Sequence, residues 1–184
     1  MILPIYVYGQ PVLRKVAENV TKDYPNLEKI IADMWETMEK SDGVGLAAPQ
    51  IGKSIRLFVI DASHFAEDDP KTEGFRKTFI NAQILSREGE EVLFNEGCLS
   101  VPGIREDIKR PSIVTIRYMD ENFVEHEETY DGIRARVVQH EYDHIEGKLM
   151  IDHLNPLKKT LLKRKLNDIS KGIVDVNYKI RAVK

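Results

Sequence analysis

Residues 139–144 constrain this chain more than any other stretch, because they read QHEYDH and contain the pattern H-E-x-x-H. In a helix, His140 and His144 lie one turn apart on the same face, where both imidazoles reach a single metal ion. Glu141 lies about a quarter-turn round the helix. That position suits it to handling the proton of a water at the metal, and makes it a poor third ligand. The sequence predicts a metal-binding helix here.

The flanking residues favour this helix. Asp131 is a residue type that caps helix starts, Ile133 and Val137 fall on the face of His140, and Gly147 is a C-terminal stop signal. The alternative is a solvated helix that carries two histidines by chance, because the motif is short.

The third ligand decides what kind of site this is. Metzincin proteases have a histidine where this chain has Met150, and other zincins take a glutamate from a later helix, whereas no glutamate follows Glu146. A third ligand must therefore come from elsewhere, and the residue types leave four candidates: Cys98, His64, His126 and His153.

Length and composition set the general class. A chain of 184 residues is expected to form one domain with a sizeable core, and its net charge of -3 favours neither nucleic acid nor a membrane surface. The start of the chain lacks the pattern of a signal or transit peptide, and no apolar run is long enough to cross a bilayer, which predicts a cytoplasmic protein. A single cysteine excludes an intramolecular disulfide.

Hydrophobic periodicity predicts the main elements. A helix is expected over residues 27–38, and a last helix follows the cap signal Asn155-Pro156 and ends near Gly172. Residues 62–77 are expected to form an exposed loop. Strands are predicted over 55–60, 78–85, 91–94, 112–119 and 123–130, with strand-like alternation over 173–183.

Two further stretches are unusual. Residues 43–52 (GVGLAAPQIG) cannot form a regular helix, and their small side chains allow another backbone to approach closely. Residues 96–102 (EGCLSVP) carry the one cysteine beside a glycine. A lone cysteine is most often a small buried hydrophobe, but a thiolate with two imidazoles is also a known ligand set for a metal with an open position.

Taken together, the segments 43–50, 96–100 and 139–147 resemble the three motifs of the peptide deformylases, in the same order. The resemblance covers most of residues 1–165, and Val101-Pro102 is similar to the bacterial type I branch. Two segments depart from the family pattern: the 62–77 loop is longer than the family core needs, and the tail after residue 170 varies.

The resemblance implies an α+β fold, with antiparallel β-strands packed around a central metal-binding H-E-x-x-H helix and with N-terminal and C-terminal helices. The implied reaction is hydrolysis of the N-formyl group from the N-terminal formyl-methionine of nascent polypeptides, releasing formate. Cys98, His140 and His144 would hold one divalent metal, usually Fe²⁺, although Zn²⁺, Ni²⁺ or Co²⁺ can occupy such sites.

Roles for the remaining site residues follow from the same resemblance. Glu141 matches the general base, and the Gln50 side chain and the Leu99 backbone N–H match the two donors to the oxyanion. The main chain at Val44, Gly45 and Gly97 would bind an extended peptide. Ile133 and Val137 would line a pocket for the first side chain, expected to be methionine.

The end of the chain is basic. From residue 157 onward there are nine Lys or Arg residues against two Asp residues, so 9 - 2 gives +7 in a chain whose total is -3. A solvated face is the ordinary explanation, but the resemblance also suggests that the helix from about residue 156 docks on the ribosome near the exit tunnel. Two other classes stay open: a zincin-like metallopeptidase, and a non-catalytic, metal-stabilised module associated with the ribosome.

Overall fold

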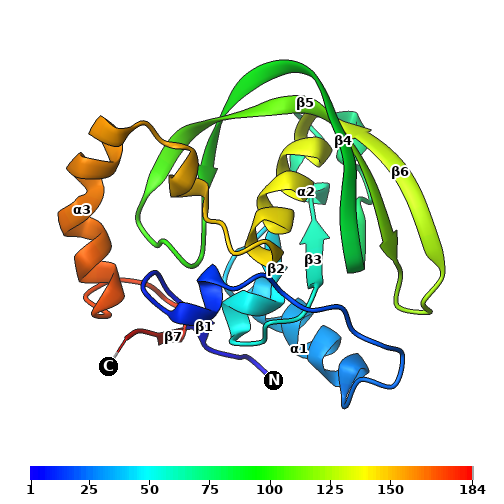
Figure 1. Cartoon of the computed structure of the whole chain (residues 1–184), viewed down its shortest axis with the longest axis horizontal. Helices are drawn as coiled ribbons and strands as arrows, with labels where there is room; N and C mark the ends of the chain where they lie inside the picture. The colour runs from blue at the N-terminus through cyan, green and yellow to red at the C-terminus, as the bar shows by residue number, and fades with distance from the viewer. Residues whose placement is uncertain (184) are drawn as a thin grey trace.

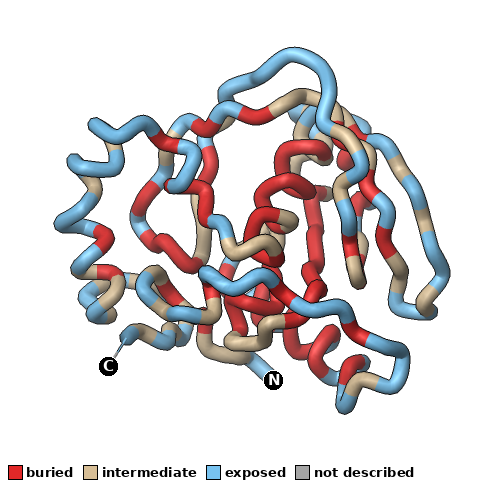
Figure 2. Tube along the Cα trace, viewed as in Figure 1, coloured by how far each residue is buried: buried red, intermediate tan, exposed pale blue. Residues whose placement is uncertain are grey.

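Helix α2 (Gly132–Ile145) lies at the centre of the computed structural model, which describes residues 1–183. A curved antiparallel sheet wraps around it, and the other helices lie outside that sheet (Figure 1). Most residues of α2 are buried, as the tube coloured by burial shows (Figure 2). The expected α+β fold is therefore confirmed, with the H-E-x-x-H segment on the enclosed helix.

Within residues 1–183 the other helices are α1 (Leu27–Lys40) and α3 (Pro156–Ser170). The main sheet has five strands, each antiparallel to its neighbour, in the order β2 (Gly45–Ala47), β3 (Leu57–Asp61), β4 (Arg76–Gly97), β5 (Arg105–Met119) and β6 (Glu125–Asp131). A short parallel pair joins β1 (Ile5–Tyr6) to β7 (Ile180–Arg181). Single 3-10 turns occupy Pro11–Arg14, Ala48–Ile51, Ser63–Phe65, Pro70–Thr72 and Met150–His153.

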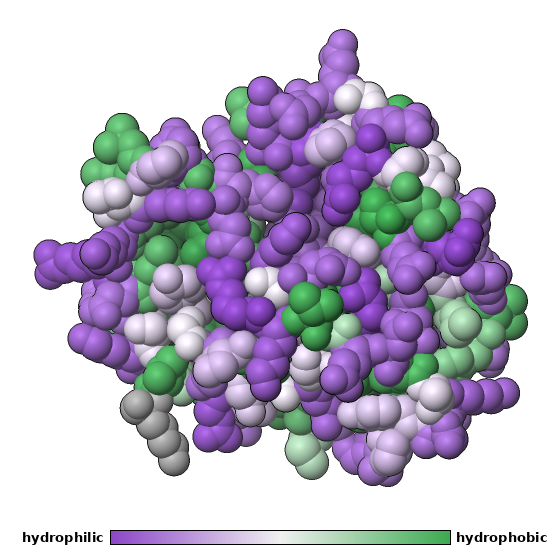
Figure 3. All heavy atoms as spheres, viewed as in Figure 1, coloured by the Kyte–Doolittle hydropathy of each residue, from purple (hydrophilic) through white to green (hydrophobic). Residues whose placement is uncertain are grey.

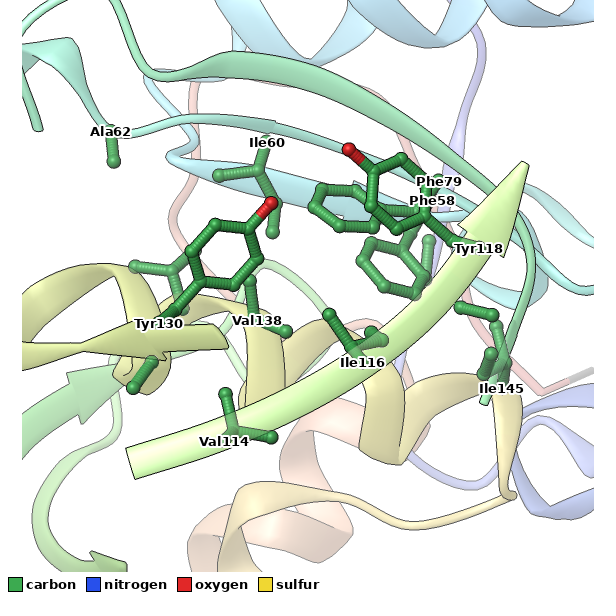
Figure 4. Packing of buried hydrophobic residues seen from close by; sticks show 14 of the residues in the cluster. Phe58, Ile60, Ala62, Phe79, Val114, Ile116, Tyr118, Tyr130, Val138 and Ile145 are labelled. Atoms are coloured by element: carbon green, nitrogen blue, oxygen red, sulfur yellow. The ribbon is translucent and has the colours of Figure 1, made fainter. Parts of the chain in front are cut away.

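One hydrophobic cluster fixes α2 against the concave face of the sheet. Phe58 of β3 and Phe79 of β4 stack with their ring centroids 4.8 Å apart. Val138 and Ile145 of α2 and Ile116 of β5 belong to the same buried cluster (Figure 4). This apolar contact holds the helix in one orientation, so the side chains on its opposite face are presented to the cavity described below.

The two strands predicted at 78–85 and 91–94 are parts of one longer strand, β4, so the predicted break between them is wrong. Its register with β5 shifts at three places, and such bulges bend a strand. The middle of β4 arches away from the core, so residues 86–91 are mostly exposed and lose the alternation that marks a half-buried strand (Figure 1). Pairing with β5, which starts at Arg105 and not near residue 112, supplies the hydrogen bonds.

The start of α2 is capped by a different aspartate from the one predicted. The Asp131 side chain makes no cap hydrogen bond and pairs with Lys71 and Arg134. Asp69 of the 62–77 loop accepts a hydrogen bond from the backbone N–H of Ile133, at 3.2 Å. The loop is therefore less free than predicted, and it contacts the helix that carries the H-E-x-x-H motif.

Helix α3 is capped as predicted, because the Asn155 side chain accepts a hydrogen bond from the N–H of Lys158 at 2.9 Å. Its apolar stripe is only partly buried: Leu166 lies in the core, whereas Leu157 and Leu161 are 69% and 73% exposed. The surface view shows hydrophobic atoms over this helix among hydrophilic ones (Figure 3). No helix within residues 1–183 is long and apolar enough to cross a membrane.

The strand-like alternation over 173–183 is present in the structure, but little of the segment is paired as a strand. Exposure alternates along the segment, as it does in extended chain, but only Ile180–Arg181 pairs with another strand. The rest is held by side chains that pack on the protein.

Candidate metal centre

Several parts of the chain converge on a cavity of about 400 Å³ beside α2. Its walls come from residues 42–45, from the end of β4 with the turn that follows it, from one face of α2, and from the C-terminal tail, with Gln50 and Phe65. Of the residues predicted to bind a peptide, the following line it: Val44, Gly45, Gly97 and Val137. Ile133 is not among the lining residues and packs against the core cluster, so its predicted contact with substrate is not supported by its position.

Cys98 and His140 line the cavity, and His144 lies next to them. Their ligand atoms all fall within 4.8 Å of one another, and Cys98 Sγ is 3.5 Å from His144 Nε2. Within residues 1–183 this is the one group of three such side chains arranged for a metal. Of the other candidates for third ligand, His126 contacts Asp120 and His153 contacts Asp143, and neither belongs to this group.

A buried carboxylate orients His140. Glu96 Oε1 lies 2.7 Å from His140 Nδ1, so the free Nε2 of the ring is the atom available to a metal. The same carboxylate accepts hydrogen bonds from Arg110 and Arg136. Burial raises the pKa of Glu96, but the hydrogen bonds from His140 and Arg110 outweigh it and hold that pKa well below its usual range.

The network continues to the surface through α2. Arg110 also donates to Asp143 at 2.8 Å, and Asp143 lies 2.7 Å from the partly exposed His153. Burial raises the pKa of Asp143, yet hydrogen bonds from His153 and Arg110 lower it to about 2. Both carboxylates of the network are therefore charged at neutral pH and matched by arginines.

Two other polar atoms in and beside the ligand group have no hydrogen-bond partner in the described part of the chain. Among residues 1–183, Glu141 Oε2 and His144 Nδ1 are buried without a hydrogen-bond partner. Burial raises the pKa of Glu141 to about 7 and lowers that of His144 to about 3. A neutral imidazole is the form that binds a metal. A cation held beside Glu141 would favour its carboxylate form.

Gly45 and Gln50 of the 43–52 segment contact Glu141 and the turn at Cys98, respectively. A Cβ added to Gly45 would clash with the side chain of Glu141, so only glycine fits there without movement. Gln50 accepts a hydrogen bond from the Ala47 N–H through Oε1, which aims its amide group at Ser100 Oγ, 3.1 Å away, and at Cys98 Sγ, 3.6 Å away.

The ligand group fits a single divalent transition metal, because one cysteine sulfur and two imidazole nitrogens lie within 4.8 Å of one another. Such a centre, with a carboxylate beside it that is not a ligand, is the arrangement of metal-dependent hydrolases. The family model that matches the chain is polypeptide deformylase, over residues 2–160. The chain belongs to the polypeptide deformylase family, metalloenzymes that remove the N-formyl group from nascent polypeptides.

Related sequences and solved structures support the same family. The peptide deformylase of Christiangramia forsetii is 54% identical over 98% of this chain and 96% of its own length, and that of Flavobacterium psychrophilum is 53% identical over 100% and 98%. The crystal structure of peptide deformylase from Thermus thermophilus is similar with a TM-score of 0.81, at 36% identity, covering 94% of this chain and 99% of that one. The similarity to deformylases thus covers the fold and nearly the full chain.

Sequence reasoning missed several residues of the site. Glu96 lies inside a recognised motif, but nothing local shows that its carboxylate faces His140. Arg110 and Tyr178 carry no motif, so only the folded chain brings Arg110 to Glu96 and Tyr178 to the cavity.

Proposed function

We propose that this chain deformylates nascent peptides with Glu141, Gln50 and Leu99 as catalytic residues and with Cys98, His140 and His144 as ligands to one divalent metal. The observation that carries the proposal is the buried Glu141 carboxylate, which has an unpaired oxygen and lies at the cavity beside the ligand group. A structural metal site needs no such carboxylate, which argues against a non-catalytic module.

A divalent metal held by these ligands would polarise the formyl oxygen and lower the pKa of water. We propose Fe²⁺ as the physiological ion, since a thiolate and two imidazoles bind it, with Zn²⁺, Ni²⁺ or Co²⁺ as substitutes. Elemental analysis of protein purified without oxygen tests this. Zinc in anaerobically purified, fully active protein would contradict the assignment of iron.

Glu141 would accept the proton of the attacking water and pass it to the nitrogen of the departing amine. Its location suits both steps, because the carboxylate is confined between Gly45 and the ligand group and has no competing hydrogen bond at Oε2 among residues 1–183.

The oxygen of the formyl group becomes negative as water adds, and it needs donors placed beforehand. The Gln50 amide is held by its bond to the Ala47 N–H and lines the cavity. The Leu99 N–H belongs to the turn beside Cys98. Losing one donor of this kind typically costs about 10²–10³ in kcat.

The peptide would bind in extended form between two unpaired strand edges. Among residues 1–183, strand β2 pairs only with β3 and the end of β4 pairs only with β5, so each leaves one edge free. Val44, Gly45 and Gly97 lie on these two segments and line the cavity. Val137 is placed to contact the methionine side chain, whereas Ile133 would support it only from the core.

We also propose one catalytic domain over residues 1–184, cytoplasmic, with α3 docking on the ribosome. The support for docking is charge, together with the two exposed leucines at 157 and 161. Reversing the charges of Lys163, Arg164 and Lys165 should reduce co-sedimentation with ribosomes and leave hydrolysis of a short peptide unchanged, since electrostatic contacts with RNA weaken with salt. Unchanged co-sedimentation at low salt would make these residues an ordinary solvated face.

The central experiment is Glu141→Gln assayed on a formyl-methionyl tripeptide, with metal content measured on the same sample. Metal should stay bound and kcat should fall by about 10²–10⁴, because only the proton acceptor is removed. Glu146→Gln, at the end of the same helix and paired with Arg56, is the matched control and should keep its activity. A near wild-type kcat in Glu141→Gln would refute the assignment. Cleavage of internal peptide bonds by wild-type protein would instead favour a metallopeptidase.

A further inference from the structure

The C-terminal tail returns to the cavity after α3, beyond the residues that the family model matches. Its short strand β7 pairs with β1, and Val176 and Tyr178 form part of the cavity wall. The tail is thereby in contact with the site, although its sequence carries none of the three motifs.

The Tyr178 hydroxyl donates a hydrogen bond of 2.9 Å to the carbonyl of Leu99. Residues 98–101 form a turn closed by a bond from the Val101 N–H to the Cys98 carbonyl, so Leu99 and Ser100 are its central residues. In such a turn the N–H of the second residue takes no part in the closing bond, which leaves the Leu99 N–H available to a ligand.

The bond from Tyr178 acts on the peptide group that is least constrained in a turn. The two common turn types differ by a flip of the peptide between the central residues, here the one whose carbonyl belongs to Leu99. Ser100 has no positive φ, so the turn is in the orientation that does not require glycine there. A flip would also move Ser100, whose hydroxyl accepts a hydrogen bond from Gln50.

We propose that Tyr178 is a positioning residue for deformylation: by holding the Leu99 carbonyl it fixes the turn that presents the Leu99 N–H and supports Gln50. The inference rests on the proposed role of these two groups as oxyanion donors. Burial raises the pKa of Tyr178 to about 12, so its hydroxyl remains a donor at neutral pH.

The test is Tyr178→Phe, which removes the hydroxyl and keeps the ring. The kcat should fall by about 2- to 10-fold, the value of one hydrogen bond, with KM changed by less than about twofold. The fall should be equal for formyl-Met-Ala and formyl-Met-Ala-Ser, because the effect passes through Leu99 and not through the peptide. Metal content should not change.

Tyr118→Phe is the matched control. It removes a buried tyrosine hydroxyl that donates to Glu128 at 2.8 Å, away from the cavity, and should lower the melting temperature without lowering kcat. Equal losses of kcat in both variants would mean that Tyr178→Phe lowers kcat only by destabilising the protein, and would overturn the inference. A rise in KM for the longer peptide alone would also overturn it, since Tyr178 would then contact substrate.

Gln50→Ala separates this inference from the proposed function on which it rests. If Gln50→Ala lowers kcat and Tyr178→Phe does not, the oxyanion site stands and the role of Tyr178 is wrong. If neither variant lowers kcat, the assignment of the oxyanion donors fails and the inference fails with it. If both lower kcat while Tyr118→Phe does not, the inference is supported.

Discussion

The two sides of the ligand group differ in how fully their polar atoms are bonded. Around Glu96, at the end of β4, Arg110 and Arg136 complete a buried network in which both oxygens of Glu96 are bonded and the His140 ring is held. On the cavity side, Glu141 keeps one oxygen without a partner among residues 1–183. The carboxylate that orients His140 is thus fully bonded, whereas the carboxylate proposed to accept a proton keeps an oxygen free.

Energetics explain why the two sides cannot be alike. Buried charges are expensive, and they are tolerated when opposite charges and hydrogen bonds surround them. A fully bonded Glu141 would have to break a hydrogen bond before accepting a proton. Leaving its oxygen free costs stability, and the saturated network behind the ligand group keeps the surrounding frame rigid.

The largest expected effect comes from removing a metal ligand, because both metal binding and activity depend on it. Cys98→Ala should lose metal and activity together, because within residues 1–183 no other cysteine, histidine or carboxylate joins the group. Metal per protein by elemental analysis, beside the formyl-peptide assay, measures both. Full metal occupancy in this variant would remove Cys98 from the ligand set.

Glu96→Ala tests the saturated side. It leaves the buried Arg136 without a carboxylate and Arg110 with Asp143 alone, so the free energy of unfolding should fall by about 3–5 kcal/mol in a denaturant titration. Glu88→Ala, exposed on the same strand, should change it by less than about 0.5 kcal/mol. A small loss in Glu96→Ala would mean that the network is not what stabilises this side.

Gly45→Ala tests the free side. The added methyl group must displace the Glu141 side chain, so kcat should fall by about 10²-fold while metal content and fold are kept. Gly43→Ala is the matched control in the same segment, because its methyl group would meet side-chain carbons of Leu99 and Met38 at 3.0 and 3.3 Å and the Gly45 carbonyl oxygen at 3.4 Å, but not Glu141. Equal kcat values in the two variants would show that the position of Glu141 is not critical.

The same contrast describes what the sequence alone can predict. The H-E-x-x-H spacing locates His140 and His144, because spacing on a helix is a local property, whereas Cys98 is one of four candidates and only the resemblance of the three motifs selects it. Glu141 is also visible in the local motif, whereas Gln50 is assigned only through the resemblance, and the catalytic roles of both stay predictions.

The saturated side is not predictable in this way. Arg110 is one of many charged residues on exposed-looking strands, and only the pairing of β4 with β5 brings it to Glu96. Tyr178 is positioned by the pairing of β7 with β1, a contact between opposite ends of the chain. Long-range partners of this kind leave no periodicity in the sequence.

The smallest expected effect concerns the start of α2, where the predicted and observed caps differ. Asp69→Ala removes the carboxylate that bonds the Ile133 N–H and should lower the free energy of unfolding by about 0.5–2 kcal/mol. Asp131→Ala removes only exposed ion pairs with Lys71 and Arg134, and should cost less. Because the cap lies two helical turns before His140, metal content should be unaffected in both variants. A larger loss of stability in Asp131→Ala would mean that Asp131 caps the helix as predicted and that the contact from the 62–77 loop is incidental. A loss of metal in Asp69→Ala would mean that the loop, and not the Glu96 network alone, holds the ligand helix in place.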